Sequence, residues 1–210
     1  MKNTVKNQLN SDYSVATKTL NTILARGKLN HKEITSILKL ENLVIVGEFL
    51  QEYQYFDAID LTYIKDFLIY NLDNSDRLFV SDLIEFAGKW EIELPYKKCI
   101  EMLKVYEDDN TYVQLSLTTY LFENLKIVHI EHLFSTLCEV LNNPECNQSV
   151  QIKAAFFLFR ITHKKEFLND LVDLVVNGSD NKELLQNLLL IDYNSEEYFE
   201  YYSLLLAILP

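Results

Sequence analysis

The sequence predicts an all-α protein, an α-solenoid (superhelix) of about five antiparallel helix pairs with an N-terminal helical cap. Only 4 Gly and 3 Pro occur in 210 residues, too few for the many tight turns of a β protein. Apolar residues recur at the i, i+3, i+4, i+7 spacing of helices that bury one face. A short segment also repeats, because Val113-Gln114-Leu115 returns 37 residues later as Val150-Gln151-Ile152.

Each copy of this repeat is expected to contain one helix pair. The match continues with Leu121-Phe122 against Leu158-Phe159, and a second apolar stripe follows in each copy. The stripes consist of Ile130, Leu133, Phe134, Leu137, Cys138 and Leu141 in the first copy, and of Leu168, Leu171, Val172 and Val175 in the second. Such units bury their apolar faces against their neighbours, which favours a stacked array.

Extending the period in both directions predicts the remaining helices. The further pairs are 42–52 with 61–72, 76–90 with 96–107, and 181–191 with 195–209. Residues 1–40 form the cap, with one helix from Tyr13 to Arg26, before Gly27, and another from His31 to Leu40. Polar turns, among them 73–76, 108–110 and 142–144, separate the helices. We find no linker, so a single domain over 1–210 is predicted, with the repeats over 41–210.

Charge is distributed unevenly along the chain. Residues 1–39 contain seven Lys or Arg and two Asp or Glu, and the other 171 residues contain 12 basic and 29 acidic ones. An acidic body repels phosphate backbones and attracts basic proteins, so a basic protein partner is predicted and nucleic-acid binding is not. The same acidity also fits a purely solubilising role.

The sequence favours a cytoplasmic protein that does not contact membranes. No apolar stretch follows Met1-Lys2-Asn3-Thr4, and the apolar runs 43–46 and 204–209 are far shorter than the roughly 20 residues of a membrane span. The three cysteines form no CxxC pair and are expected to be free thiols. Cys99 and Cys138 lie on apolar stripes, whereas Cys146 lies in a turn where exposure is expected.

No catalytic, cofactor or metal site is predicted. The sequence contains neither GxSxG nor a glycine-rich phosphate loop. His129 and His132 have a spacing that could place them on one helix face, with Glu131 or Cys138 as further ligands, but no HExxH motif supports a metal. A structural or solvent-facing role is therefore favoured for both histidines.

On the repeat residues the chain resembles the HEAT-like repeat family, whose units are paired antiparallel helices of about 40 residues. The resemblance covers 40–210 and is strongest over 110–178. More typical repeats of this family have a Pro, an Asp and an Arg in the first helix and the turn, and this chain lacks them. Arg160, together with Asp170 or Asp173, is the nearest candidate for these residues. A divergent array or an irregular bundle therefore stays open. The resemblance implies a binding scaffold whose concave face is formed by the second helix of each pair.

Acidic and aromatic residues lie opposite the apolar stripes of these second helices and are predicted to form one partner-binding strip. The strip consists of Asp66, Tyr70, Glu101, Glu131, Glu139, Asp170, Asp173, Glu197 and Tyr201. Aromatic side chains supply contact area and carboxylates select a cationic partner. Tyr198, Tyr202, Leu205 and Leu209 have helical spacing and fit the end of the core better than a binding face.

These features predict a non-catalytic protein-binding module that docks a basic protein. Small, acidic helical-repeat proteins of this kind resemble immunity proteins, which neutralise basic toxins by covering their active sites. A scaffold or adaptor in a larger assembly is the alternative. A helical-repeat enzyme such as a DNA glycosylase is a lesser one, because it would need a basic groove. The oligomeric state stays open.

Overall fold

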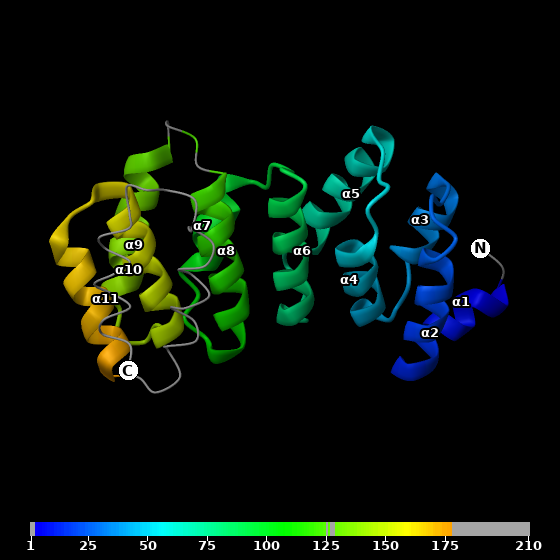
Figure 1. The fold of residues 1–210 in the computed structure, drawn as a ribbon, viewed down its shortest axis with the longest axis horizontal. Coiled ribbons are helices and arrows are strands. Elements are labelled where there is room, and N and C mark those ends of the chain that lie inside the picture. Colours follow the sequence, from blue (N-terminus) through cyan, green and yellow to red (C-terminus); the bar gives the residue numbers. More distant parts are fainter. Residues whose placement is uncertain (1–2, 125, 127–128, 178–210) are drawn as a thin grey trace. The chain divides into compact units, whose positions relative to one another are not determined.

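The computed structural model describes residues 3–124, 126 and 129–177, and these residues form helices and no strands (Figure 1). The all-α prediction is confirmed. The chain divides into two compact units, residues 1–96 and 97–210, which we describe separately. The helices predicted at 181–191 and 195–209 lie outside the described residues.

The first unit begins with two short helices around a longer one. Its helices are α1 (Asn3–Leu9), α2 (Tyr13–Leu24), α3 (His31–Ile37), α4 (Leu43–Glu52), α5 (Ala58–Asn71) and α6 (Arg77–Lys89). Helix α1 was not predicted, because it is only seven residues long and Leu9 is its one buried residue. Helix α5 begins three residues earlier than predicted, since Asp57 caps it by accepting hydrogen bonds from the N–H groups of Ile59 and Asp60.

Helix α4 forms the centre of the first unit. It packs against α2 on one side and α6 on the other, while α5 packs against α6 and α3. Being enclosed on both sides, α4 is apolar over most of its surface, and Ile45, Val46, Phe49 and Leu50 are fully buried. Phe49 also belongs to an aromatic cluster with ring centroids 4.7 to 6.0 Å apart, which includes Tyr53, Phe56, Phe86 and Trp90.

The second unit is organised around α10. Its elements are α7 (Tyr96–Leu103), the 3₁₀ turn η1 (Asp108–Asn110), α8 (Thr111–Glu123), α9 (Ile130–Asn142), α10 (Gln148–Thr162) and α11 (Lys165–Asn177). Helix α10 packs against α8, α9 and α11 (Figure 1). Its central residues 154–159 are all buried, because these three neighbours together cover the middle of the helix.

The repeated Gln of the sequence has the same role in both copies. The side-chain amide of Gln114 in α8 donates to the carbonyl oxygen of Leu103, the last residue of α7, at 2.9 Å. The amide of Gln151 in α10 donates to the carbonyl oxygens of Leu141 (3.1 Å) and Asn143 (2.9 Å) at the end of α9. Each amide satisfies carbonyls that have no intrahelical donor at a helix C-terminus. Helix α7 was predicted to reach residue 107 but ends at Leu103. Side-chain amides donate to its last carbonyl oxygens, in place of the backbone N–H groups that a longer helix would supply.

Replacing Gln114 by Met keeps most of the side-chain volume and removes the donor. Because Gln114 is 1% exposed, the Leu103 carbonyl is left without this partner in the interior. We expect a loss of about 1–3 kcal/mol in the free energy of unfolding, measured by urea denaturation followed by circular dichroism. Gln151→Met should cost less, since Gln151 is only partly buried and water can replace it. Thr119→Ala in the same helix is the control, and equal stabilities of all three variants would contradict the capping role.

Candidate protein-binding surface

The described members of the predicted strip are all exposed, but they belong to both units. Asp66 and Tyr70 lie on α5 of the first unit, and the Tyr70 side chain is 85% exposed. The second unit carries Glu101 on α7, Glu131 and Glu139 on α9, and Asp170 and Asp173 on α11. The exposure is as predicted, whereas a single strip across the two units stays a prediction. Glu197 and Tyr201 lie outside the described residues.

Two of the predicted acids are partly neutralised by lysines. Glu139 on α9 pairs with Lys104, and Glu101 pairs with Lys97 one turn earlier on α7, with 3.9 Å between charged atoms. These pairs reduce the attraction that either carboxylate can offer a partner. The interpretation of the sequence did not include these cations, because it considered only the residues opposite the apolar stripes.

Asp170 and Asp173 lie beside a groove on the second unit. Its volume is about 240 Å³, and it is lined by Leu141, Asn142, Gln148, Asp170, Asp173 and Leu174. The Gln148 amide donates to the Leu174 carbonyl oxygen at 2.9 Å and so joins the start of α10 to α11. Within the described part of the chain neither aspartate makes an ion pair. The groove thus combines leucine side chains with two uncompensated carboxylates.

The surroundings of Asp170 disfavour its negative charge. Partial burial raises the pKa of its carboxyl group, and the nearby carboxylates of Asp173 and Glu166 raise it further. A cation in the groove would relieve this repulsion, so the site favours a positively charged side chain over a neutral one.

A second acidic position, which sequence reasoning missed, lies in the first unit. The Asp82 carboxylate on α6 packs directly against Gly47 on α4, where an added Cβ would come within 2.6 Å of Oδ2. Burial, together with the charges of Glu85 and Asp76, raises the pKa of Asp82 to about 6. The sequence feature that could have revealed this contact is Gly47, because a glycine inside an apolar helix often marks the close approach of another part of the chain.

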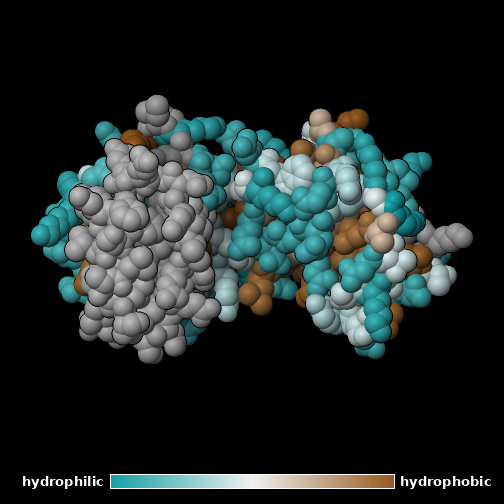
Figure 2. All heavy atoms as spheres, in the orientation of Figure 1, coloured by the Kyte–Doolittle hydropathy of each residue, from teal (hydrophilic) through white to brown (hydrophobic). Residues whose placement is uncertain are grey.

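Apolar side chains also reach the surface of the first unit. The exposed ones at helix starts include Tyr13 on α2, Val44 on α4, Ile59 on α5 and Leu78 on α6, with exposed fractions of 60%, 54%, 69% and 59%. Figure 2 shows apolar atoms at the surface of this unit among hydrophilic ones. The Tyr13 hydroxyl donates to Glu48 Oε1 at 2.6 Å, so the aromatic ring is held over α4.

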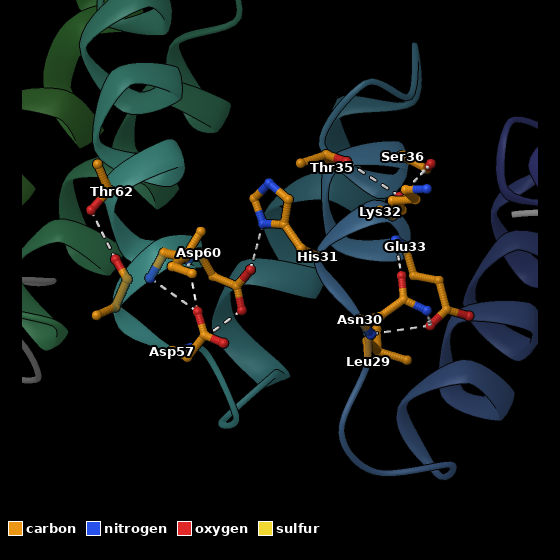
Figure 3. Close-up of polar contacts among 12 residues, drawn as sticks. Leu29, Asn30, His31, Lys32, Glu33, Thr35, Ser36, Asp57, Asp60 and Thr62 are labelled. Carbon is orange, nitrogen blue, oxygen red and sulfur yellow. Dashed lines mark hydrogen bonds and ion pairs between the residues drawn. The ribbon is translucent and has the colours of Figure 1, made fainter.

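His31 links α3 to α5 in the first unit (Figure 3). Its Nδ1 lies 2.8 Å from Oδ1 of Asp60, whose side chain is 3% exposed. Asp60 also accepts from the Asp57 backbone N–H at 3.2 Å, within the capping box that starts α5. A buried carboxylate requires such partners, so this cluster has a structural role. The sequence predicted a helix start at His31 and gave no sign of its contact with Asp60.

The cysteines are free thiols, as predicted, and their surroundings favour the protonated form. Burial raises the pKa of Cys99 to about 12 and that of Cys146 to about 11. The expected exposure of Cys146 is wrong: the turn between α9 and α10 folds inward and leaves its side chain 7% exposed. Cys138 is partly buried, and burial raises the pKa of its thiol as well. A thiol with a raised pKa is a weak nucleophile at neutral pH.

In the described ranges 3–124, 126 and 129–177, no three His, Cys, Asp or Glu side chains gather as metal ligands. None of the helices described there combines the length and apolar character that crossing a bilayer requires.

Comparisons with models of protein families, with curated proteins and with solved structures gave no match to this chain. The HEAT-like resemblance therefore stays a prediction, and function is argued from the residues themselves.

Replacing Asp82 by Asn should stabilise the protein at neutral pH. The folded-state pKa of about 6 lies above the ordinary value of 3.8, so Asp82 favours folding when protonated and opposes it as the pH rises through 6. The shift corresponds to at most about 3 kcal/mol, and solvent screening of this half-buried group reduces our expectation to about 1 kcal/mol.

The measurement is the free energy of unfolding from pH 4 to pH 8. The stability advantage of Asp82→Asn should be present at pH 8 and shrink toward pH 4, where the folded wild type is protonated at this position and the pH is close to the unfolded-state pKa of 3.8. Glu52→Gln, at an exposed position of α4 that does not contribute to the Asp82 pKa, is the control. An advantage independent of pH would show that the ionised carboxylate is not its source.

Replacing His31 by Ala should destabilise the first unit. The Asp60 carboxylate would keep its backbone partner and lose its side-chain one, at a cost of about 1–3 kcal/mol in the free energy of unfolding. Lys32→Ala, at the exposed neighbouring position of α3, is the control. Chemical denaturation should show the loss for His31→Ala only, and unchanged stability would mean that water replaces the imidazole.

Proposed function

We propose that this chain is a non-catalytic protein-binding module that docks a basic protein through the groove beside α11. The observation that carries the proposal is the pair Asp170 and Asp173, which have no ion-pair partner among the described residues and border a groove that two leucine side chains help to line. Uncompensated charge of one sign supports recognition of a partner of the opposite sign.

The composition of the groove supports a Lys or Arg side chain as its occupant. Such side chains carry a cationic head on an apolar stem. Leu141 and Leu174 can contact the stem while Asp170 and Asp173 contact the head, and the Gln148 amide is already engaged with Leu174. Binding would also favour the charged form of Asp170 against the neighbouring Glu166.

The finer fold proposal is a stack of antiparallel helix pairs with these acids on the second helices. Support comes from the contacts of α10 with α8 before it and α9 and α11 beside it, and from the equal roles of Gln114 and Gln151. In such a stack α7, α9 and α11 occupy equivalent places, as the pair Lys104–Glu139 between α7 and α9 and the Phe134–Phe167 ring contact between α9 and α11 suggest.

The specific form of the proposal is that the basic partner is a toxin and the chain its immunity protein. The support is the acidic body, at 29 acidic against 12 basic residues beyond position 39, on a small helical protein. An immunity role would appear as growth rescue when the chain and its captured partner are expressed together.

The groove can be tested by reversing its charge. Asp170→Lys with Asp173→Lys should abolish capture of a basic protein from the lysate of the source cells. Asp108→Lys with Asp109→Lys, at exposed positions of η1, changes the net charge equally and should leave capture intact. The readout is mass spectrometry of proteins retained at low and moderate salt, and retention should fall as salt rises.

Equal loss of capture in both double variants would show that only net charge matters, which contradicts a docking groove. Full retention by the groove variant would exclude this site, and capture dominated by neutral proteins would exclude a basic partner.

A further inference from the structure

Helices α2 and α4 begin side by side in the first unit. Asn10, which precedes α2, accepts hydrogen bonds through Oδ1 from the backbone N–H groups of Glu41 and Asn42, which precede α4, at 3.2 and 3.4 Å. The Tyr13 hydroxyl at the start of α2 reaches Glu48 in the second turn of α4. The first turn of α2 therefore lies against the first two turns of α4.

Helices α4 and α6 also begin at the same end of this unit. Gly47 of α4 lies against the Asp82 carboxylate of α6. Further along both helices, the Gln51 carbonyl oxygen accepts a hydrogen bond from Nζ of Lys89 at 2.8 Å. Because the two contacts follow in the same order on both helices, α4 and α6 run in the same direction.

The three helices expose large apolar side chains at these adjoining starts. Tyr13, Val44 and Leu78 are the first or second residues of α2, α4 and α6, and each is more than half exposed. Val44 and Leu78 each precede by one turn the residue through which α4 and α6 touch, so they belong to the stripes along which these helices meet. We call these three residues the apolar row.

Two carboxylates lie one turn further along the helices than the apolar row. Glu48 and Asp82 each follow the row residue of their own helix by four positions, which places them on the same helix face. In the described part of the chain, neither takes part in an ion pair. Burial raises the pKa of Asp82, and the negative charges of Glu85 and Asp76 raise it further. A negatively charged edge therefore follows the apolar row.

The basic side chains of α4 and α6 do not neutralise this edge. Helix α4 contains none, and α6 contains Arg77 at its first position and Lys89 at its last. Each donates a hydrogen bond to a backbone carbonyl oxygen. The face formed by the apolar row, Glu48 and Asp82 thus joins apolar surface to negative charge, and it favours a partner segment that is apolar and basic.

The spacing of the apolar row matches a helix that crosses α2, α4 and α6. Packed helices are about 8–10 Å apart, and seven residues of a helix rise about 10.5 Å. Apolar side chains at every seventh position of a crossing helix can therefore reach the three members of the row in turn. Glu48 and Asp82 lie about 6 Å to one side of the row, where they can contact basic side chains on one flank of that helix.

We propose that this face binds a basic amphipathic helix of a partner protein, with its apolar stripe on the apolar row and its Lys or Arg side chains at Glu48 and Asp82. The face is a second docking site, beyond the groove beside α11, and shares no residue with that groove. Each of the two proposals can therefore fail without the other.

A designed peptide provides the probe. It is a labelled helix of about 18 residues with three leucines at seven-residue spacing, lysines along one flank and alanines elsewhere. Fluorescence anisotropy measures its binding to the full chain carrying Asp170→Asn and Asp173→Asn, so that the groove beside α11 does not contribute. We expect saturable binding that weakens as salt rises, and no binding of the same peptide with glutamates in place of the lysines.

The apolar row is tested by Val44→Gln with Leu78→Gln. This double variant should weaken binding about tenfold or more, because it removes two of the three apolar contacts. Ile59→Gln with Tyr70→Gln is the matched control, since it replaces two exposed apolar side chains of α5 outside the face, and binding should be unchanged.

The acidic edge is tested by Glu48→Gln with Asp82→Asn. Binding should again weaken about tenfold or more and lose most of its salt dependence. Asp108→Asn with Asp109→Asn, an equal change of charge at exposed positions of η1, should leave binding unchanged. Circular dichroism checks that every variant keeps its helical content.

Absence of saturable binding would overturn the proposal, and so would equal affinities of the face variants and their controls. Sedimentation addresses the other occupant of such a face. A chain that forms dimers, which Val44→Gln with Leu78→Gln dissociates, would place a second copy on the apolar row and would also overturn the proposal.

Discussion

Helices as short as these depend on side-chain amides that satisfy the carbonyl groups at their C-termini. The last four carbonyls of a helix have no intrahelical donor, and in a seven- or eight-residue helix they are about half of the total. Gln114 and Asn110 supply donors at the end of α7, and Gln151 does so at the end of α9. Because Gln114 and Gln151 belong to the next α-helix and Asn110 directly precedes one, the same hydrogen bonds end one helix and position its successor.

Helices α10 and α4 are buried because neighbouring helices pack on more than one side of each. Helix α10 touches α8, α9 and α11, so its surface offers little room for polar groups, and its hydrogen-bonding side chains lie near its ends. Helix α4 is in the same position in the first unit, and Gly47 lets α6 come close enough to bring Asp82 against it. Charged groups consequently lie mostly on the outer faces, whereas Asp60 is buried and Asp82 is half-buried.

Much of this fold could be predicted from the sequence, because it is local and periodic. The i, i+3, i+4 stripes identified α9 and α11, the extended repeat period predicted α4 and α6, and the repeated Val-Gln segment marked a real hydrogen bond at Gln151. Contacts between residues distant in sequence could not be predicted. The pairing of Lys104 with Glu139, the burial of Cys146 and the contact between His31 and Asp60 depend on how helices pack, for which a single sequence has no periodic signal.

The second unit and most of the first contain few lysines and arginines, which leaves some acidic side chains without a cationic partner. Beyond residue 39 basic residues are already few, and some of them serve the backbone: Lys89 donates to the Gln51 carbonyl oxygen and Lys153 to that of Leu115. Within the described ranges Lys89 makes no ion pair beside this hydrogen bond. Asp82 and Asp170 consequently lie near other acids, and the pKa of each is raised. The repulsion between Asp170 and its acidic neighbours remains in the folded chain, and a cationic partner bound there would relieve it.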